Sequence, residues 1–294
     1  MNGEGQEEVG GKSPSPYNPS VIRLWRPAAQ RNLRNQWSRI VAGQQKWVSA
    51  SADGRSHASS LVNLYLSRKY MPAMDLGVLG EMTKIKDKAC AKLARQEELC
   101  WIKLSASYRN MVAAISLMLD ASRSMRCFLK GPAGTPIVQF SFQQEHGHDT
   151  GDGDGIPVFS FLAISFLEAL AQEIVQMFRS ELFLKRLLLV EFCSISFQAA
   201  NATRDDKWSK EIYEGEFDDL NKIGLFSGES CVPAPPSTDK WKLDKLMAEK
   251  SDTDPKREVL QVYLTAWLAE VNISSCRIDE IISMVEEEMK VRLA

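Results

Sequence analysis

Residues 85–125, IKDKACAKLARQEELCWIKLSASYRNMVAAISLMLDASRSM, decide the fold class of this protein. Apolar side chains recur there every three or four residues, which is the period of an α-helix. The stripe includes Met82, Ile85, Leu93, Leu104 and Ile115, with Glu97 occupying one of its steps. Between about Val78 and Leu129 the chain has no proline and, after Gly80, no glycine. The pattern predicts one long helix over 78–129, typical of a coiled-coil seam or of the spine of a helical bundle.

The chain before this helix predicts two shorter helices. Leu33, Trp37 and Ile40 repeat at helical spacing, and Pro27 suits the first turn of a helix that would begin there. A second helix is expected over about 57–70, ended by Pro72. Residues 1–20 are rich in Gly, Glu, Ser and Pro, so we expect a disordered tail.

The chain after the long helix predicts a small β-hairpin and a further helix. Gly131 and Pro132 end the helical pattern, and Val138, Phe140 and Phe142 then alternate with polar residues, the period of a half-buried strand. We expect this strand to pair with 158–161, giving a hairpin over about 137–161. An apolar helix should follow over about 162–182, whereas 183–197 fits either a helix or a strand.

The remaining residues predict a linker and a C-terminal helical segment. Residues 199–237 are rich in turn formers and end in Val-Pro-Ala-Pro-Pro, which favours a linker. Three helices are expected beyond it, over 241–249, 255–271 and 275–292. The sequence therefore predicts a mainly α protein with a helical core over 21–198 and an acidic helical segment over 238–294.

Charge divides the chain into a basic part and an acidic part. Residues 21–130 carry 19 Lys and Arg against 7 Asp and Glu, whereas residues 131–294 carry 16 against 28. Such asymmetry points to an acidic partner for the basic part. That partner is either a separate molecule or the acidic part of this chain or of a neighbouring copy. Ordinary solvated helix faces are the simplest alternative.

Motifs for catalysis or cofactor binding are missing from the sequence. It contains no phosphate-binding loop, no nucleophile elbow and no dinucleotide fingerprint. The loop from His146 to Asp154 concentrates two histidines and four acids with Glu145, but a calcium loop that starts at Asp149 or Asp152 lacks the carboxylate required at its twelfth position. We expect neither enzymatic activity nor a metal or cofactor; a metal-dependent enzyme at this loop is the weakest of three functional hypotheses.

The cysteines and the hydropathy pattern bear on the compartment. The six cysteines are scattered, with no pair at the spacing of a zinc or redox motif. The longest uncharged apolar stretch covers residues 156–167, well short of the about 20 residues needed to cross a bilayer. The first 20 residues lack a secretory signal. We expect a protein of the nucleus or cytoplasm, neither secreted nor transmembrane.

The leading functional hypothesis is an adaptor or complex subunit, associated with chromosomes or the cytoskeleton, that binds other proteins through helix packing and a basic N-terminal surface. The residues expected to bind a partner are Arg23, Trp25, Arg26, Arg31, Arg34, Trp37, Arg39, Met82, Ile85, Leu93, Leu104 and Ile115. Self-association is compatible with this hypothesis. The second hypothesis is a nuclear factor that binds nucleic acid through the basic residues 21–109.

Overall fold

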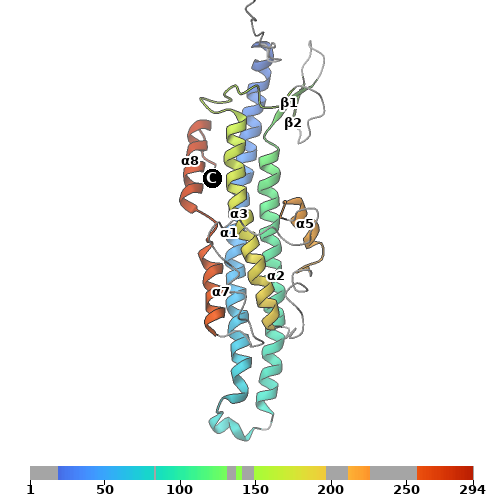
Figure 1. Ribbon diagram of the computed structural model, residues 1–294, viewed down its shortest axis with the longest axis vertical. Coiled ribbons are helices and arrows are strands. Elements are labelled where there is room, and N and C mark those ends of the chain that lie inside the picture. The colour runs from blue at the N-terminus through green and yellow to red at the C-terminus, as the bar shows by residue number, and fades with distance from the viewer. Residues whose placement is uncertain are drawn as a thin grey trace, which may run out of the picture.

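The computed structural model describes residues 19–82, 84–130, 137–140, 149–196, 211–225 and 257–293 and shows a mainly α protein. Its framework is a long antiparallel helical hairpin of α1 (Pro19–Tyr70) and α2 (Ile85–Arg123). Two short 3₁₀ turns, η1 (Met71–Ala73) and η2 (Gly77–Glu81), connect them at one end of the molecule. That end extends beyond all other helices (Figure 1).

Helix α1 is a single helix of 52 residues, so the prediction of two shorter helices was wrong. Pro27 lies inside it rather than in its first turn, and Gly43 and Gly54 lie in its middle. Both glycines face neighbouring helices closely. A Cβ atom at Gly43 would lie 2.4 Å from Met118 Cγ, and one at Gly54 would lie 2.6 Å from the Trp267 ring. Tertiary packing therefore overrides the low helix propensity of glycine.

Helix α2 is shorter than predicted at both ends. Lys84 has a left-handed backbone (φ 61°), which separates α2 from η2. After Arg123 the chain leaves the helix and forms strand β1 (Cys127–Lys130), which pairs antiparallel with β2 (Ile137–Phe140). The backbone N–H of Cys127 also donates to the Gly151 carbonyl (2.9 Å). These backbone bonds replace those that a longer helix would have made.

The predicted pairing of the strand at β2 with residues 158–161 was wrong, because β2 pairs with β1. Phe140 lies opposite Cys127, whereas residues 158–161 form a loop rather than a strand. In that loop the Glu288 carboxylate oxygen Oε1 accepts the backbone N–H groups of Ser160, Phe161 and Leu162 at 2.7–2.8 Å. A side chain from the end of the sequence thus satisfies donors that the expected strand would have paired. Phe142 lies outside the described residues.

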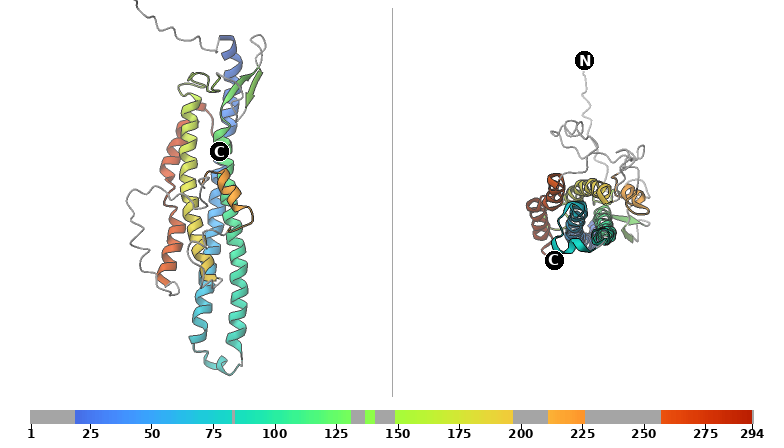
Figure 2. Two further views of the ribbon diagram at one scale, coloured as in Figure 1. Left: turned by 45° about the vertical axis from the view of Figure 1, so that its right-hand side comes forward. Right: turned by 90° about the horizontal axis from the view of Figure 1, so that it is seen from below.

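Helix α3 (Ile164–Ser196) resolves the ambiguity over the chain after Leu182, because the helix continues to Ser196. Helix α5 (Glu216–Lys222) falls inside the expected linker, most of which lies outside the described residues together with the helix expected over 241–249. Helices α7 (Arg257–Ala269) and α8 (Ser275–Met289) match the last two expected helices. Seen from below, α3, α7 and α8 gather on one side of the α1–α2 pair (Figure 2).

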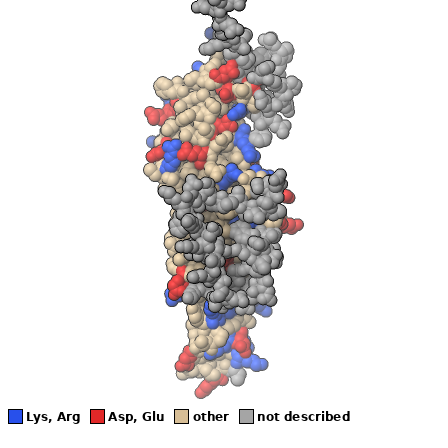
Figure 3. Space-filling model, viewed as in Figure 1, with Lys and Arg blue, Asp and Glu red and all other residues tan. Residues whose placement is uncertain are grey.

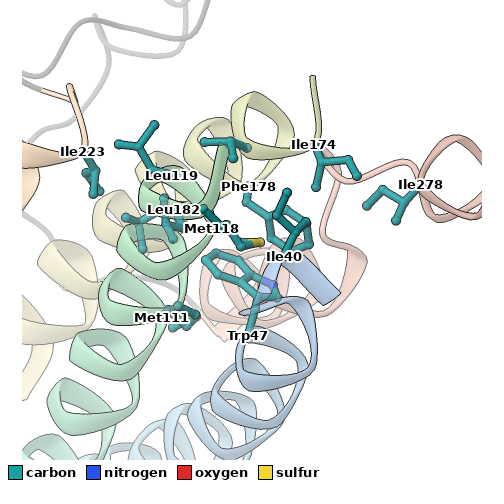
Figure 4. Close-up of a cluster of buried hydrophobic side chains, with 14 of the residues drawn as sticks. Ile40, Trp47, Met111, Met118, Leu119, Ile174, Phe178, Leu182, Ile223 and Ile278 are labelled. Carbon is teal, nitrogen blue, oxygen red and sulfur yellow. The ribbon is translucent and has the colours of Figure 1, made fainter. Parts of the chain in front are cut away.

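The hydrophobic core lies where these helices meet. Figure 4 shows Ile40 and Trp47 of α1 beside Met118 of α2, with Phe178 of α3 and Ile278 of α8 closing the cluster. Trp47 and Phe178 pack edge to face, with 5.2 Å between ring centroids. Burying such side chains contributes about 1.5–3 kcal/mol each. Helix α3 therefore completes the core that α1 and α2 share.

The basic and acidic parts of the sequence do not form separate halves of the molecule. The acidic helices α3 and α8 pack beside the arginine-rich start of α1, and charges of both signs are interspersed over the upper part of the face in Figure 3. Arg126 of the basic part pairs with Glu168 of the acidic part (3.0 Å). The internal pairing considered from the sequence is thus found in part.

Two consecutive cations of α3 hold the peripheral helices. Arg186 donates to Glu216 (2.7 Å), whose Oε1 also accepts the Tyr108 hydroxyl (2.8 Å), and all three side chains are buried. Burial and the Glu216 charge raise the pKa of Tyr108 well above its usual value, so its hydroxyl remains a donor. Lys185 pairs with Glu181 (3.0 Å) and donates to the Trp267 carbonyl at the end of α7.

Glu216→Gln tests the first of these contacts. The change removes the Glu216 charge from its buried pair with Arg186, and breaking such a pair costs about 3–5 kcal/mol of unfolding free energy. Chemical denaturation measures the loss, and Glu214→Gln at an exposed position is the control, for which we expect a change within about 0.5 kcal/mol. Equal effects of the two substitutions would contradict the buried pair.

Gly54→Ala tests the close approach of α1 to α7. Helix propensity alone predicts a gain of about 1 kcal/mol. The added methyl group would overlap the buried Trp267 ring, and overpacking of this kind costs about 1–3 kcal/mol. We expect a net loss of stability in thermal unfolding. Gly80→Ala, whose Cβ would meet nothing within 4 Å, should leave the melting temperature unchanged; a more stable Gly54→Ala protein would show that α7 is not docked there.

Candidate protein-binding surface

Exposed apolar side chains gather near the closed end of the helical hairpin. Of the fifteen large hydrophobic residues exposed in the described part of the chain, seven lie between residues 70 and 102. Tyr70, Met74, Val78, Leu79 and Met82 lie at the closed end itself, with Val78 92% exposed, whereas Leu99 and Ile102 lie about four helical turns along α2. Exposed apolar side chains that cluster in this way are typical of a binding surface.

A groove of about 440 Å³ runs between α1 and α2 near this end. This distal groove is lined by Ser60, Asn63, Leu64, Gln96, Leu99, Cys100 and Lys103. Leu99 is 58% exposed. The helical period turns Leu99 and Lys103 away from Tyr108, which contacts α5 and the α3 cation. The groove therefore opens away from the side of α2 on which Tyr108 meets α3 and α5.

The α1 wall of the groove consists of Ser60, Asn63 and Leu64, and its one hydroxyl group is already bonded. Ser60 Oγ donates to the Ser56 carbonyl (2.9 Å), and Ser67 Oγ, one turn further, donates to the Asn63 carbonyl (2.8 Å). A partner that removed water from this wall would not leave those donors unsatisfied, which keeps the cost of desolvation low.

An ion pair joins α1 and α2 beside the distal groove. Arg68 of α1 binds Glu97 of α2 through two hydrogen bonds (2.7 and 2.9 Å). The hydrogen bond to Glu97 raises the pKa of Arg68, which keeps the Arg68 guanidinium charged. Leu61 and Leu104 are buried on either side of the helix contact. The groove is consequently formed before any partner arrives.

The outer surface of α2 combines positive charge with the exposed apolar residues. Its exposed residues at steps of three or four are Lys92, Arg95, Leu99, Ile102 and Lys103, here called the basic–apolar face. Of the nearby acidic residues, Glu97 is bound to Arg68, and Glu98 is exposed at the edge of this face, one turn from Arg95 and Ile102. The face itself carries three cations, Lys92, Arg95 and Lys103, against this one carboxylate.

The structure places the residues of the predicted apolar stripe in two environments. Leu104 and Ile115 are fully buried against α1, while Ile85 and Leu93 are half-buried and Met82 is 56% exposed. The greater part of the stripe thus packs within the chain, because α1 is itself the helix that covers it. The Met82 end lies in the exposed region described above.

The predicted basic and aromatic residues of α1 separate in the same way. Trp25 and Trp37 are fully buried, and Trp25 Nε1–H donates to the Cys127 carbonyl (2.9 Å). Arg26 donates to the Pro157 carbonyl (3.0 Å) and Arg34 to the Met289 carbonyl (3.3 Å), so both help hold the loop and α8. The remaining predicted residues, Arg23, Arg31 and Arg39, are exposed.

In the described part of the loop considered as a metal site, aspartate carboxylates accept hydrogen bonds from the backbone of the same loop. Asp149 accepts the Gly151 backbone N–H (2.8 Å), and Asp152 accepts that of Asp154 (3.0 Å). His146 and His148 lie outside the described residues. Among the residues that the structure describes, no cluster of three or more His, Cys, Asp or Glu could hold a metal ion.

Leu99, Ile102 and Lys103 were not identified from the sequence. The predicted apolar stripe of α2 does not include these residues. An informative signal was present, because Leu99 and Ile102 are apolar residues on the polar side of an amphipathic helix. Recognising it required knowing which face α1 covers.

Comparisons with known proteins found no match, so a functional assignment depends on the fold and on this surface. No family model, curated protein or solved structure matches the chain. None of the described helices has both the length and the apolar composition needed to cross a membrane. The fold defines a mainly α protein built on a long helical hairpin.

The cysteines allow the exposure of the groove to be measured. Cys127 is fully buried, and burial raises its pKa to about 12, so at pH 8 only about one thiol in 10,000 is ionised. Cys276 is exposed, and Cys100 in the groove is half-buried. We expect iodoacetamide to modify Cys276 first, then Cys100, with Cys127 protected until unfolding. Site-resolved mass spectrometry gives the three rates, and rapid modification of Cys127 would contradict its position in the core.

Proposed function

We propose that this protein is a non-enzymatic adaptor or complex subunit that binds another protein through the closed end of its α1–α2 hairpin. The observation that carries this proposal is the gathering of seven exposed large apolar residues within residues 70–102. Their burial by a partner would supply the hydrophobic part of the binding free energy. The surrounding lysine and arginine side chains would supply orientation and speed of association.

The arrangement of the buried charged groups supports a structural role. Arg186, Lys185 and Glu288 each bind a neighbouring element, and these contacts account for their burial without a catalytic task. The described cysteines are free thiols, in keeping with the nucleus or cytoplasm as the proposed location. Association with chromosomes or the cytoskeleton remains within the same proposal.

The test is a double substitution in the full chain, Leu99→Asp with Ile102→Asp. Both residues are more than half exposed (58% and 56%), so folding should be unaffected, as circular dichroism and thermal unfolding will verify. Proteins captured from cell extracts by the unchanged chain should be retained at least about tenfold less by the variant, equivalent to 1.4 kcal/mol. Sedimentation of the purified protein will show whether the captured partner is a second copy.

A matched control carries the same added charge on another helix. Val262→Asp with Leu268→Asp places two carboxylates at exposed positions of α7 (63% and 57%). It should retain every partner. Equal retention by both double variants, or equal loss from both, would refute the proposed surface.

A further inference from the structure

We infer that the partner of this surface is an acidic amphipathic helix that lies in the distal groove along the basic–apolar face of α2. The inference rests on the proposed function and adds the chemistry of the partner. It follows from the shape of the groove, the state of its polar groups and the signs of its charges.

The shape of the groove suits a helix. Two antiparallel helices can hold a third helix along their line of contact, as α3 does where it packs against both α1 and α2 on the other side of this hairpin. On the uncovered side the α1 wall presents Ser60 and Asn63, which are small enough for another helix backbone to approach. Leu64 and Leu99 offer apolar contact from the two walls.

The bonding state of the groove also favours a helix over an extended strand. An extended peptide would need backbone hydrogen bonds from the groove. The described groove lies between two α-helices, whose backbone groups are bonded within each helix, and the Ser60 hydroxyl is bonded to its own helix. A helix satisfies its own backbone groups and needs only side-chain contacts.

The charges specify the sign of the partner. Lys92 and Lys103 lie on either side of Leu99, eleven residues or about 16 Å apart along α2, which is three helical turns. Arg95 adds a third exposed cation. A complementary helix would therefore place an apolar residue against Leu99 and carboxylates one to two turns before and after it.

Nucleic acid is the competing ligand for a basic surface. It would use phosphate contacts and gain little from Leu99 or Ile102, since these side chains are apolar. The central position of two exposed apolar residues among the cations therefore favours a protein helix. The two ligands differ in what an apolar-to-polar substitution does, and the experiment uses that difference.

The experiment measures fluorescence anisotropy of labelled synthetic peptides mixed with the full chain at about 0.15 M salt. The first peptide is about 21 residues long, with leucine at helical a and d positions and glutamate at most others. The second replaces its glutamates with lysine, and the third keeps the acidic composition but scrambles the leucines. A labelled DNA duplex is the fourth probe.

The acidic amphipathic peptide should bind best. Its affinity should fall at least tenfold in the Leu99→Asp protein. In the double variant Lys92→Glu with Lys103→Glu, the preference should reverse in favour of the lysine peptide. Lys222→Glu with Arg292→Glu, at exposed positions elsewhere, changes the net charge equally and should leave the preference intact.

Several results would overturn the inference. Equal binding of the scrambled peptide would show that charge alone attracts it. Tighter binding of the duplex, insensitive to Leu99→Asp, would identify a nucleic-acid surface. Absence of binding by the acidic amphipathic peptide also rejects this partner class. If that peptide fails while Leu99→Asp with Ile102→Asp still abolishes partner capture, the proposed surface stands and only the helix assignment is wrong.

Discussion

The contact between α1 and α2 supports everything else in this protein. Two long antiparallel helices meet along their length, and their approach is close where Gly43 faces Met118 and the Ala114 carbonyl. Both helices exceed the length at which an isolated helix becomes stable, yet α1 carries a proline and two glycines that weaken it locally. Burial of Trp25, Trp37 and Trp47 against the rest of the core compensates for that weakness.

Helix α3 turns this hairpin into a bundle and determines where the remaining elements attach. Its apolar residues complete the core, and its buried cations Lys185 and Arg186 each bind one peripheral unit. A buried cation without its counter-charge is costly, so α5 must dock with Glu216 in place beside Arg186. Lys185 has its counter-charge, Glu181, on α3 itself and holds α7 through the Trp267 carbonyl. The Glu288 carboxylate of α8 fixes the loop before α3, because it accepts hydrogen bonds from three backbone N–H groups of that loop.

Helix α3 covers one side of the hairpin, α7 and α8 flank α1, and α5 flanks α2. The functional proposal follows from the surface that these helices leave uncovered. The other side and the closed end remain uncovered by the described helices. There the α2 surface exposes Leu99 and Ile102 among cations, next to a groove held open by the Arg68–Glu97 pair. A surface fixed in advance loses little conformational entropy on binding, which favours specific association.

The sequence by itself determined the mainly α class, the location of α2 and the last two helices, because apolar periodicity reflects the burial of one helix face. It also indicated a β-strand at 137–140. It did not determine that α1 is continuous, that Cys127–Lys130 is the partner strand, or that Trp25 and Trp37 are buried. Those features depend on contacts between residues distant in the sequence. For the same reason only the tertiary structure separated Leu104, which α1 covers, from Leu99, which it leaves exposed.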